Sequence, residues 1–229
     1  MNFSDSGIIL LRQDFRETDR VACLYTREHG RINVRFPGVL RPQGKLKSLC
    51  EPFTFAEYRI YARRGGTIGT ATGGKITSVF PHIRCDLRRT ALALHFCELV
   101  YRLTPMHQPS AEKFDLLLSA LTELEYGEIN AAFAPAFTLR LMMLAGFGLD
   151  HPVLQIDAEF WRKMHEEKLS ALCFSEPQDM LALAKCSSIC RRFLNRYLTY
   201  PLHTTKNIGL EQDDAPWQTA HSLIPAKRA

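Results

Sequence analysis

The chain has 229 residues, 46% of them apolar, and it carries 29 Lys and Arg against 24 Asp and Glu. A chain of this length and composition can bury a sizeable core, in one large domain or two small ones. No segment reaches the roughly 18 apolar residues that span a bilayer, and the N-terminus lacks the basic start of a secretory signal. We therefore expect a cytoplasmic protein that does not bind membranes.

The positive charge is concentrated at one end of the sequence. Residues 1–80 hold 13 Lys and Arg against 7 Asp and Glu, whereas residues 81–229 hold 16 against 17. A field concentrated in this way attracts a polyanion to one end of the molecule and leaves the other end for neutral or protein partners. The alternative interpretation is that these cations are ordinary residues of a solvated surface and attract no particular partner.

The first 80 residues consist of short apolar runs broken by turn residues. This pattern predicts about five strands, with a tight turn at Glu28-His29-Gly30 between the second and the third. Five short strands with a positive face favour a small barrel such as an OB-fold. The predicted strands are Gly7 to Leu11, Val21 to Thr26, Ile32 to Phe36, Phe53 to Ala62 and Thr67 to Thr77.

The third predicted strand carries cations on one face. Arg31, Asn33 and Arg35 alternate with apolar residues, and side chains on a strand point to opposite faces with period 2. One face should therefore be buried while the other presents cations. This layout indicates a protein that holds nucleic acid. Further cations extend the positive surface beyond the strand: Arg41, Lys45, Lys47, Arg59, Arg63 and Arg64.

Aromatic residues are interleaved with these cations. Small barrels that bind single strands combine a cationic groove with rings on which bases stack. Alternate strand positions must point inward, however, so about half of the rings are expected in the barrel core. The rings concerned are Phe36, Phe53, Phe55, Tyr58 and Tyr61.

After Pro81 the apolar period becomes helical. Apolar residues recur at helical spacing from Leu92 to Leu103, from Phe114 to Leu124 and from Phe133 to Leu144. The third helix should end near Gly146 and Gly148, and a weaker segment follows through Trp161. For a last helix, Ser175 and Gln178 predict a capping box, Pro177 the first helical position and Pro201 the end.

The predicted fold class is α+β, a small β-barrel followed by a helical C-terminal domain. The expected boundaries are 1–80 for an OB-fold nucleic-acid-binding domain and 81–210 for a helical bundle. Residues 211–229 are polar and contain two prolines, which indicates a loosely ordered tail.

Enzymatic and metal sites have weak support. Gly69 to Lys75 fits G-x-x-x-x-G-K, but Ile76 stands where a phosphate-binding loop needs a hydroxyl, which favours a glycine-rich hairpin. Cys186 and Cys190 share a helix face without the four-ligand spacing of a zinc site. His95 and Glu98 indicate a histidine satisfied inside a bundle. We expect no enzyme, no cofactor and no metal, with the seven cysteines as buried free thiols.

The order of motifs resembles the RecO family of bacterial recombination and repair mediators. The likeness covers about 200 residues and is stronger in the N-terminal third. It includes Gly7-Ile8-Ile9-Leu10, Glu17-Thr18-Asp19-Arg20, Thr26 to Arg31, Gly38 to Arg41, Leu46-Lys47-Ser48, Glu51-Pro52-Phe53-Thr54, Arg63 to Gly66, Glu98-Leu99, Phe137 to Gly148, Arg191 to Leu194 and Pro201 to Thr204.

The resemblance implies a function as well as the same two-part fold. It implies a non-enzymatic, nucleoid-associated mediator that binds single- and double-stranded DNA and anneals complementary strands. With RecR, such a mediator helps load RecA onto strands coated by single-strand-binding protein. The DNA contacts it implies are Arg31, Arg35, Arg41, Lys45, Lys47, Arg63 and Arg64. A protein-interaction scaffold of the same fold, with little DNA binding of its own, is the rival hypothesis.

Two segments depart from the family pattern. His151-Pro152-Val153-Leu154 stands where many members begin a cysteine-rich zinc module, which indicates a zinc-free branch. In the family, the acidic tail of single-strand-binding protein docks in a hydrophobic pocket of the helical domain flanked by cations. The segment that usually supplies two arginines there reads Ala134-Pro135-Ala136. Candidate substitutes are Arg140, Arg191, Arg192 and Lys206.

Overall fold

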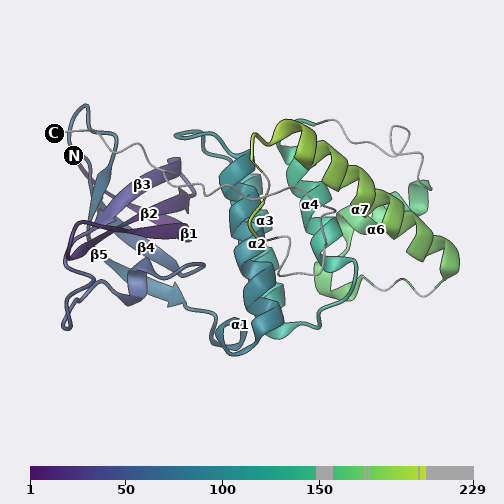
Figure 1. The fold of residues 1–229 in the computed structure, drawn as a ribbon, viewed down its shortest axis with the longest axis horizontal. Helices are drawn as coiled ribbons and strands as arrows, with labels where there is room; N and C mark the ends of the chain where they lie inside the picture. The colour runs from purple at the N-terminus through teal and green to yellow at the C-terminus, as the bar shows by residue number, and fades with distance from the viewer. Residues whose placement is uncertain (148–156, 173, 175, 201, 205–229) are drawn as a thin grey trace.

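The protein consists of a closed β-barrel and a group of helices packed on one side of it (Figure 1). The computed structural model describes residues 1–147, 157–172, 174, 176–200 and 202–204. The predicted class, an OB-fold barrel followed by a helical region, is confirmed. Gly148, the departure at His151 to Leu154, Pro201 and the predicted tail from Glu211 onward lie outside the described residues.

Five strands form the barrel in the order β1-β2-β3-β5-β4, and β4 closes it against β1. All neighbours are antiparallel except β3 and β5, which run parallel. This is the arrangement of a small Greek-key barrel. The strands are β1 (Asn2–Phe15), β2 (Asp19–Thr26), β3 (Gly30–Phe36), β4 (Phe55–Tyr61) and β5 (Gly69–Ser78).

Strand β1 is much longer than the apolar run Gly7 to Leu11 predicted. Its first half pairs with β4 and its second half with β2, with a register shift between Ile9 and Leu11. A strand that pairs on both edges of a closing barrel must extend past its buried centre. Its polar ends, including Ser4 and Gln13, carry no apolar signal.

The barrel interior is filled by side chains that point inward from all five strands. Tyr58 is fully buried there, and its hydroxyl donates to the Leu49 carbonyl at 3.0 Å or to the Thr54 carbonyl at 3.2 Å. Burial raises the pKa of Tyr58. The ring of Phe36 meets Tyr58 edge-on, with centroids 6.2 Å apart. These large side chains hold the strands at the spacing that a five-stranded barrel requires.

Helices follow the barrel in an order close to the predicted one. Asp86 caps α2 by accepting from the Arg89 amide at 3.0 Å, and Ser110 caps α3 by accepting from the Lys113 amide at 3.3 Å. The short first helix was not predicted. The helices are α1 (Pro81–Cys85), α2 (Leu87–Leu103), α3 (Ala111–Tyr126), α4 (Phe133–Leu144), α6 (Ala158–Glu166) and α7 (Pro177–Tyr197).

Helix α7 begins with Pro177 in its first turn, as predicted. The predicted capping box is wrong, because the N-cap is Glu176, which makes no side-chain capping hydrogen bond. Ser175 itself lies outside the described residues. A proline supplies no amide at the helix start, so the helix needs one capping partner fewer there.

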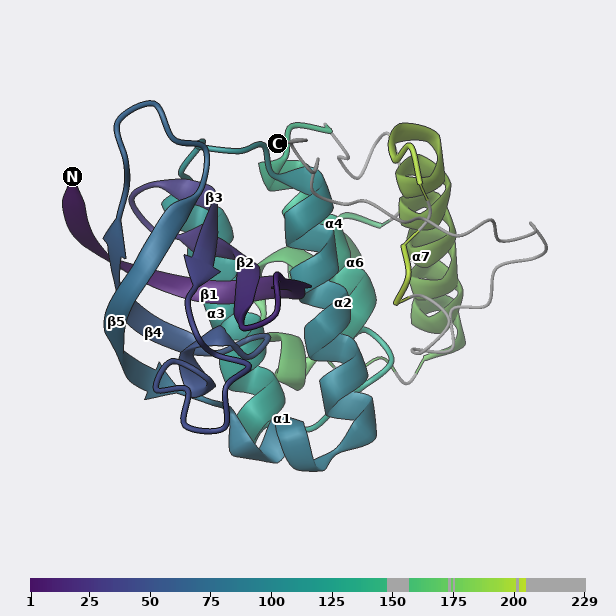
Figure 2. The same ribbon diagram turned by 60° about the vertical axis from the view of Figure 1, so that its left-hand side comes forward.

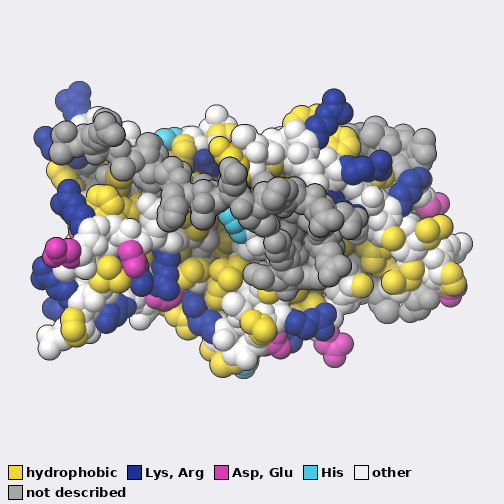
Figure 3. Space-filling model, in the orientation of Figure 1, with side chains coloured by type: hydrophobic (Ala, Val, Ile, Leu, Met, Phe, Trp, Pro, Cys, Tyr) yellow, Lys and Arg dark blue, Asp and Glu magenta, His cyan; other side chains and the backbone are white. Residues whose placement is uncertain are grey.

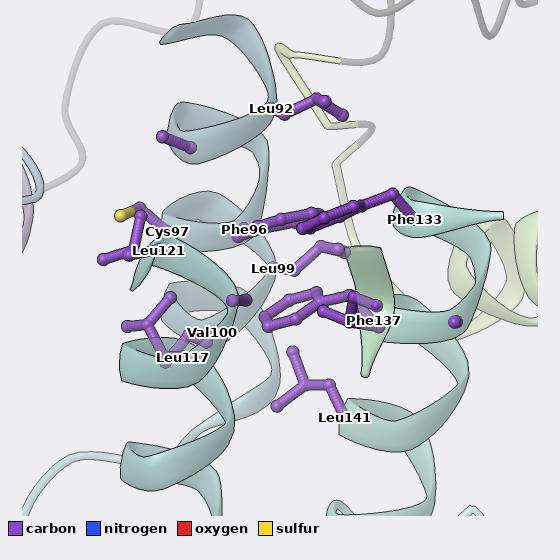
Figure 4. Close-up of a cluster of buried hydrophobic side chains, with 14 of the residues drawn as sticks. Leu92, Phe96, Cys97, Leu99, Val100, Leu117, Leu121, Phe133, Phe137 and Leu141 are labelled. Carbon is purple, nitrogen blue, oxygen red and sulfur yellow. The ribbon is translucent and has the colours of Figure 1, made fainter. Parts of the chain in front are cut away.

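The helical core is built around stacked phenylalanine rings. Figure 4 shows Phe96 of α2 beside Phe133 and Phe137 of α4, with ring centroids 6.0 and 4.0 Å from that of Phe96. The same hydrophobic cluster includes Leu10 and Tyr25 from β1 and β2. Barrel and helices therefore share a core, and both ribbon views place α2 and α3 against the barrel (Figures 1 and 2).

Most of the described cysteines match the predicted buried thiols. Cys23, Cys50, Cys97, Cys186 and Cys190 are buried and free, whereas Cys173 lies outside the described residues. Cys85 is exposed, which corrects the prediction for that residue. It sits at the end of the short unpredicted α1, on the molecular surface.

Among the described helices, none is both long and apolar enough to cross a membrane.

Candidate nucleic-acid interface

The barrel has a covered face and an open face. On the covered face, β1 and β2 pack against α2 and α3. The open face comprises the outward side of β3 beyond Arg31 and of β5 and β4, with the 37–47 loop and the 62–68 hairpin tip. The described helices lie on the other side of the barrel (Figure 1). The cations predicted to contact nucleic acid fall on both faces.

Arg31 belongs to the covered face. The predicted alternation on β3 is confirmed, since apolar residues are buried and Arg31, Asn33 and Arg35 are partly exposed. The Arg31 guanidinium, however, donates to the Tyr101 carbonyl of α2 and lies 4.5 Å from the centroid of that ring. The Arg31 carbonyl also accepts from the His107 amide at 3.0 Å. Arg31 thus joins the barrel to the helices.

Arg35 lies two residues further along β3, on the open face. Its Nε is 3.9 Å from the Asp19 carboxylate, and about a third of its side chain is exposed. Asp19 also accepts from the Gly38 amide at 2.8 Å, and this hydrogen bond is the main cause of the lowered pKa of Asp19. Asp19 therefore holds the start of the basic loop beside Arg35.

The basic loop after β3 is anchored at several points. Val39 is buried in the barrel core, and the Gly44 amide donates to the Arg41 carbonyl at 3.0 Å. Gly44 approaches Gly38 so closely that a Cβ there would lie 2.6 Å from the Gly38 carbonyl oxygen, so only glycine fits. A loop fixed in this way presents its cations from defined positions. The exposed loop cations are Arg41, Lys45 and Lys47.

A second pair of cations lies at the tip of the β4–β5 hairpin. Arg63 and Arg64 are exposed, and the Gly66 amide closes the turn by donating to the Arg63 carbonyl at 2.9 Å. Gly65 adopts a positive φ of 75°, which glycine allows at no steric cost. The turn is thus compact, and both arginines project from it.

The strands between loop and hairpin place a ring beside a cation. Arg35 pairs with Thr70 of β5, and Thr70 pairs with Tyr61 of β4, so the three share one row on the outer face. Neighbouring strands are about 4.8 Å apart, which puts Tyr61 about 10 Å from Arg35. Tyr61 is 46% exposed. A nucleotide whose phosphate meets Arg35 would have Tyr61 within reach of its base.

Arg59 is an open-face cation that the predicted contact set omitted. It is exposed on β4, and a Cβ on the facing Gly73 would lie 2.7 Å from its Nη2. The absent side chain at Gly73 therefore leaves room for the guanidinium. Lys75, opposite Glu57 in the register, is also exposed. Arg59 was predicted to extend the positive surface, and the alternation along β4 could also have placed it among the contacts.

Most of the interleaved aromatic rings are not available for stacking. Phe36 and Tyr58 fill the barrel, while Phe53 and Phe55 belong to the core shared with the helices. The Phe55 ring lies 6.2 Å from that of Phe114. Two of the five rings lie in the barrel core, which agrees with the expected half, but among the other three only Tyr61 is exposed. Strand period cannot show that helices will cover an outward face.

Four of the seven acidic residues in residues 1–80 lie within 4.0 Å of an arginine or histidine nitrogen. Glu51 forms ion pairs with Arg12 and Arg20, and Asp14 lies 2.8 Å from the Arg20 Nε. Such pairs neutralise the carboxylates locally, so the remaining cations set the sign of the field. In Figure 3, Lys and Arg side chains lie along the barrel end of the molecule, and others lie over the helices.

The apparent phosphate-binding motif has a different role. Gly69 to Lys75 lies within β5, an arm of the β4–β5 hairpin, rather than in a loop before a helix, so the interpretation as a glycine-rich hairpin is confirmed. A Cβ on Gly69 would lie 2.8 Å from Ile60, and one on Gly74 2.7 Å from the Glu57 carbonyl. These glycines allow close packing against β4. The segment therefore lacks the geometry of a nucleotide-binding loop.

His95 is satisfied inside the bundle, as predicted. It is buried, and its Nδ1 lies 2.8 Å from the Thr204 hydroxyl. Burial lowers the pKa of His95 to about 4. Glu98 accepts from the amides of His203 and Thr204 at 2.9 and 3.0 Å. Both side chains thus fix the chain after α7.

The predicted partner-binding cations are spread over the helical part. Arg140 donates to the carbonyls of Met164 and Glu167 at 2.7 and 2.5 Å, and burial lowers its pKa, so it holds that segment. Arg191 lines a cavity beside Pro135. Arg192 lines a shallow groove on another side of α7. Lys206 lies outside the described residues.

Comparison with known proteins matches both parts of the chain to the same family. Residues 1–80 match the family model of the Recombination protein O N terminal, and residues 84–151 match that of the Recombination protein O C terminal. Relatives named DNA repair protein RecO include one from Pelotomaculum thermopropionicum, 34% identical over 145 residues, or 63% of this chain and 56% of the relative. The relative from Bacillus subtilis is 32% identical over 143 residues, or 62% of this chain and 54% of the relative.

A third relative, from Myxococcus xanthus, is 34% identical over 144 residues, which are 63% of this chain and 59% of the relative. The match therefore spans a little over half the length of each of these curated relatives.

Proposed function

Because the chain belongs to the RecO family, we propose that it binds single- and double-stranded DNA through the open face of its barrel and anneals complementary strands in DNA repair and recombination. The observation that carries this proposal is the anchored loop with three exposed cations beside the hairpin arginines, on a barrel that holds more cations than acids. The proposed DNA contacts are Arg35, Arg41, Lys45, Lys47, Arg59, Arg63 and Arg64.

The proposed mechanism is physical rather than chemical. Cations that contact phosphates release condensed counterions, which drives binding at low salt. Two strands held on the same positive surface repel each other less, so pairing proceeds faster. Tyr61 supplies a surface on which a base stacks. No bond is made or broken, and no cofactor is needed. Arg31 is left out of the contact set because its guanidinium contacts Tyr101.

Partners and location follow from the family. We propose that the chain acts with RecR in the cytoplasm, at the nucleoid, and helps load RecA onto strands coated by single-strand-binding protein. The acidic tail of that protein would dock in the helical part, where Arg191 lines a cavity beside Pro135. In this division, residues 1–80 hold DNA and residues 81–210 hold partners.

An annealing assay with a charge-reversal variant tests the proposal. Lys45→Glu with Lys47→Glu reverses two exposed loop charges, and Arg162→Glu with Lys168→Glu is the matched change on exposed helical-side residues. We expect the loop variant to lose most of the annealing acceleration. The salt dependence of its single-strand binding should also fall, by about 0.7 decades per decade of salt for each lost phosphate contact. Equal behaviour of both variants would contradict the proposal.

The rival function is a protein-interaction scaffold, and the groove between α4 and α7 favours it. Arg88 and Arg191 lie at this largely apolar groove, a setting suited to an acidic peptide. A scaffold predicts that the loop variant keeps its partner binding and its repair function in cells. The annealing mediator predicts that repair is lost although the partners still bind.

A further inference from the structure

The groove between α4 and α7 is formed by two adjoining cavities of about 150 and 370 Å³. They share Ala134 and Pro135 of α4 and Ala184 and Ser187 of α7. An apolar cavity of about 150 Å³ is large enough to hold a single aromatic ring. The smaller cavity therefore has the size for one six-membered ring, and the adjoining larger cavity offers room for the rest of a bigger side chain.

Each of the two cavities is lined by one arginine. Arg191 lines the smaller cavity and Arg88 the larger one, and both residues are exposed. From Met180 to Leu210 the sequence contains Lys and Arg but no Asp or Glu. A largely apolar groove in such a field suits a peptide that combines an aromatic residue with carboxylates.

The described chain ends beside the groove. Leu202 and His95 line the smaller cavity. The Thr204 hydroxyl in turn contacts His95 and Glu98. The sequence after Thr204 therefore starts at the groove. Trp217 lies 13 positions after Thr204, and such a length spans at most about 45 Å when extended. Trp217 can reach either cavity.

The sequence that follows has the complementary composition. Residues 211–217 contain Glu211, Asp213 and Asp214, no cation, and Trp217 at the end. We propose that this segment of the chain docks in the groove between α4 and α7, with the Trp217 ring in the smaller cavity and its carboxylates near Arg88 and Arg191. A docked segment would occupy the place of any acidic peptide from a partner. The inference does not depend on DNA binding by the barrel.

Fluorescence of Trp217 in the full-length protein tests this inference. Trp161→Phe leaves Trp217 as the single tryptophan. Ala184→Glu places a carboxylate in the groove at an exposed helix position, and Leu181→Glu is the matched change on α7 outside the groove. We expect blue-shifted emission and weak acrylamide quenching in the parent. Ala184→Glu should shift the emission to the red and raise quenching severalfold, whereas Leu181→Glu should change neither.

Two results would overturn the inference. One is emission of a fully exposed indole in the parent protein at low salt, or the same emission with and without Ala184→Glu. The other is protection of Trp217 that grows with protein concentration, which would assign the groove to a second copy of the chain. Asp213→Asn with Asp214→Asn provides an independent check, because removing these charges should expose Trp217 without altering the groove.

Discussion

On the covered face of the barrel, arginines contact other parts of the protein. Arg27 donates to both carboxylate oxygens of Asp115 on α3, at 2.6 and 3.0 Å, and Arg31 contacts Tyr101 on α2. On the open face, Arg41 and Arg63 are exposed. Arg31 and Arg35 follow the same alternation on β3, so the position of the helices decides whether an arginine contacts protein or stays available for a ligand.

The largest expected difference between the two faces is in the stability lost when a glycine is replaced by alanine. Gly30 on the covered face has a φ of 67°, and a Cβ there would lie 2.4 Å from the Gln108 carbonyl. Gly65 on the open face has a similar φ but nothing within 4 Å. We expect Gly30→Ala to lower the free energy of unfolding by about 3 kcal/mol or more, and Gly65→Ala by about 1 kcal/mol. Urea denaturation measures both, and equal losses would contradict the assignment of faces.

Arg31 and Arg35 allow the covered and open faces to be compared within one strand, β3. Arg31→Ala removes a charged hydrogen bond and a cation–π contact, so we expect it to lower the free energy of unfolding by about 2 kcal/mol. Arg35→Ala should change stability by less than about 0.5 kcal/mol but weaken binding of a single-stranded oligonucleotide. Thermal unfolding and fluorescence anisotropy on both variants test this pair. The account fails if Arg31→Ala is the variant that weakens DNA binding at unchanged stability.

Tyr61 lies on the open face, and replacing it should have a smaller effect, on single-strand binding alone. Tyr61→Ala should weaken single-strand binding about tenfold, because stacking of one base on an aromatic ring contributes about 1 to 3 kcal/mol. The matched control is Tyr126→Ala, since Tyr126 is 78% exposed on α3, away from the open face. If both variants bind an oligonucleotide equally well in an anisotropy titration, Tyr61 is not a stacking residue.

The sequence predicted the strands and helices better than the contacts between them. Period alone identified the five strands and the helices around Phe96, Phe114 and Phe137, because burial on one side imposes that period. It could not show that Arg31 meets Tyr101, which lies 70 residues later. It also could not show that helices cover Phe55. Such contacts depend on how the barrel and helices pack, and a local pattern carries no information about that.

The sequence also could not show how the basic loop is held in place. The loop cations Arg41, Lys45 and Lys47 stand in a polar stretch, and the sequence identified their charge. Their fixed presentation depends on the Asp19 contact to Gly38 and on the close approach of Gly44 to Gly38. Asp19 carried no sign of this role beyond its place in the family motif.

The most direct test of the central claim is hydrogen–deuterium exchange of the full chain with and without a single-stranded oligonucleotide. The amides of Gly44 and Gly66 are hydrogen-bonded within the loop and the hairpin tip, so they are suitable reporters. We predict that DNA slows exchange across residues 37–47 and 62–68 and leaves the α2 and α3 peptides unchanged. Slower exchange in α2 and α3 with none in the loop and hairpin would contradict binding at the open face.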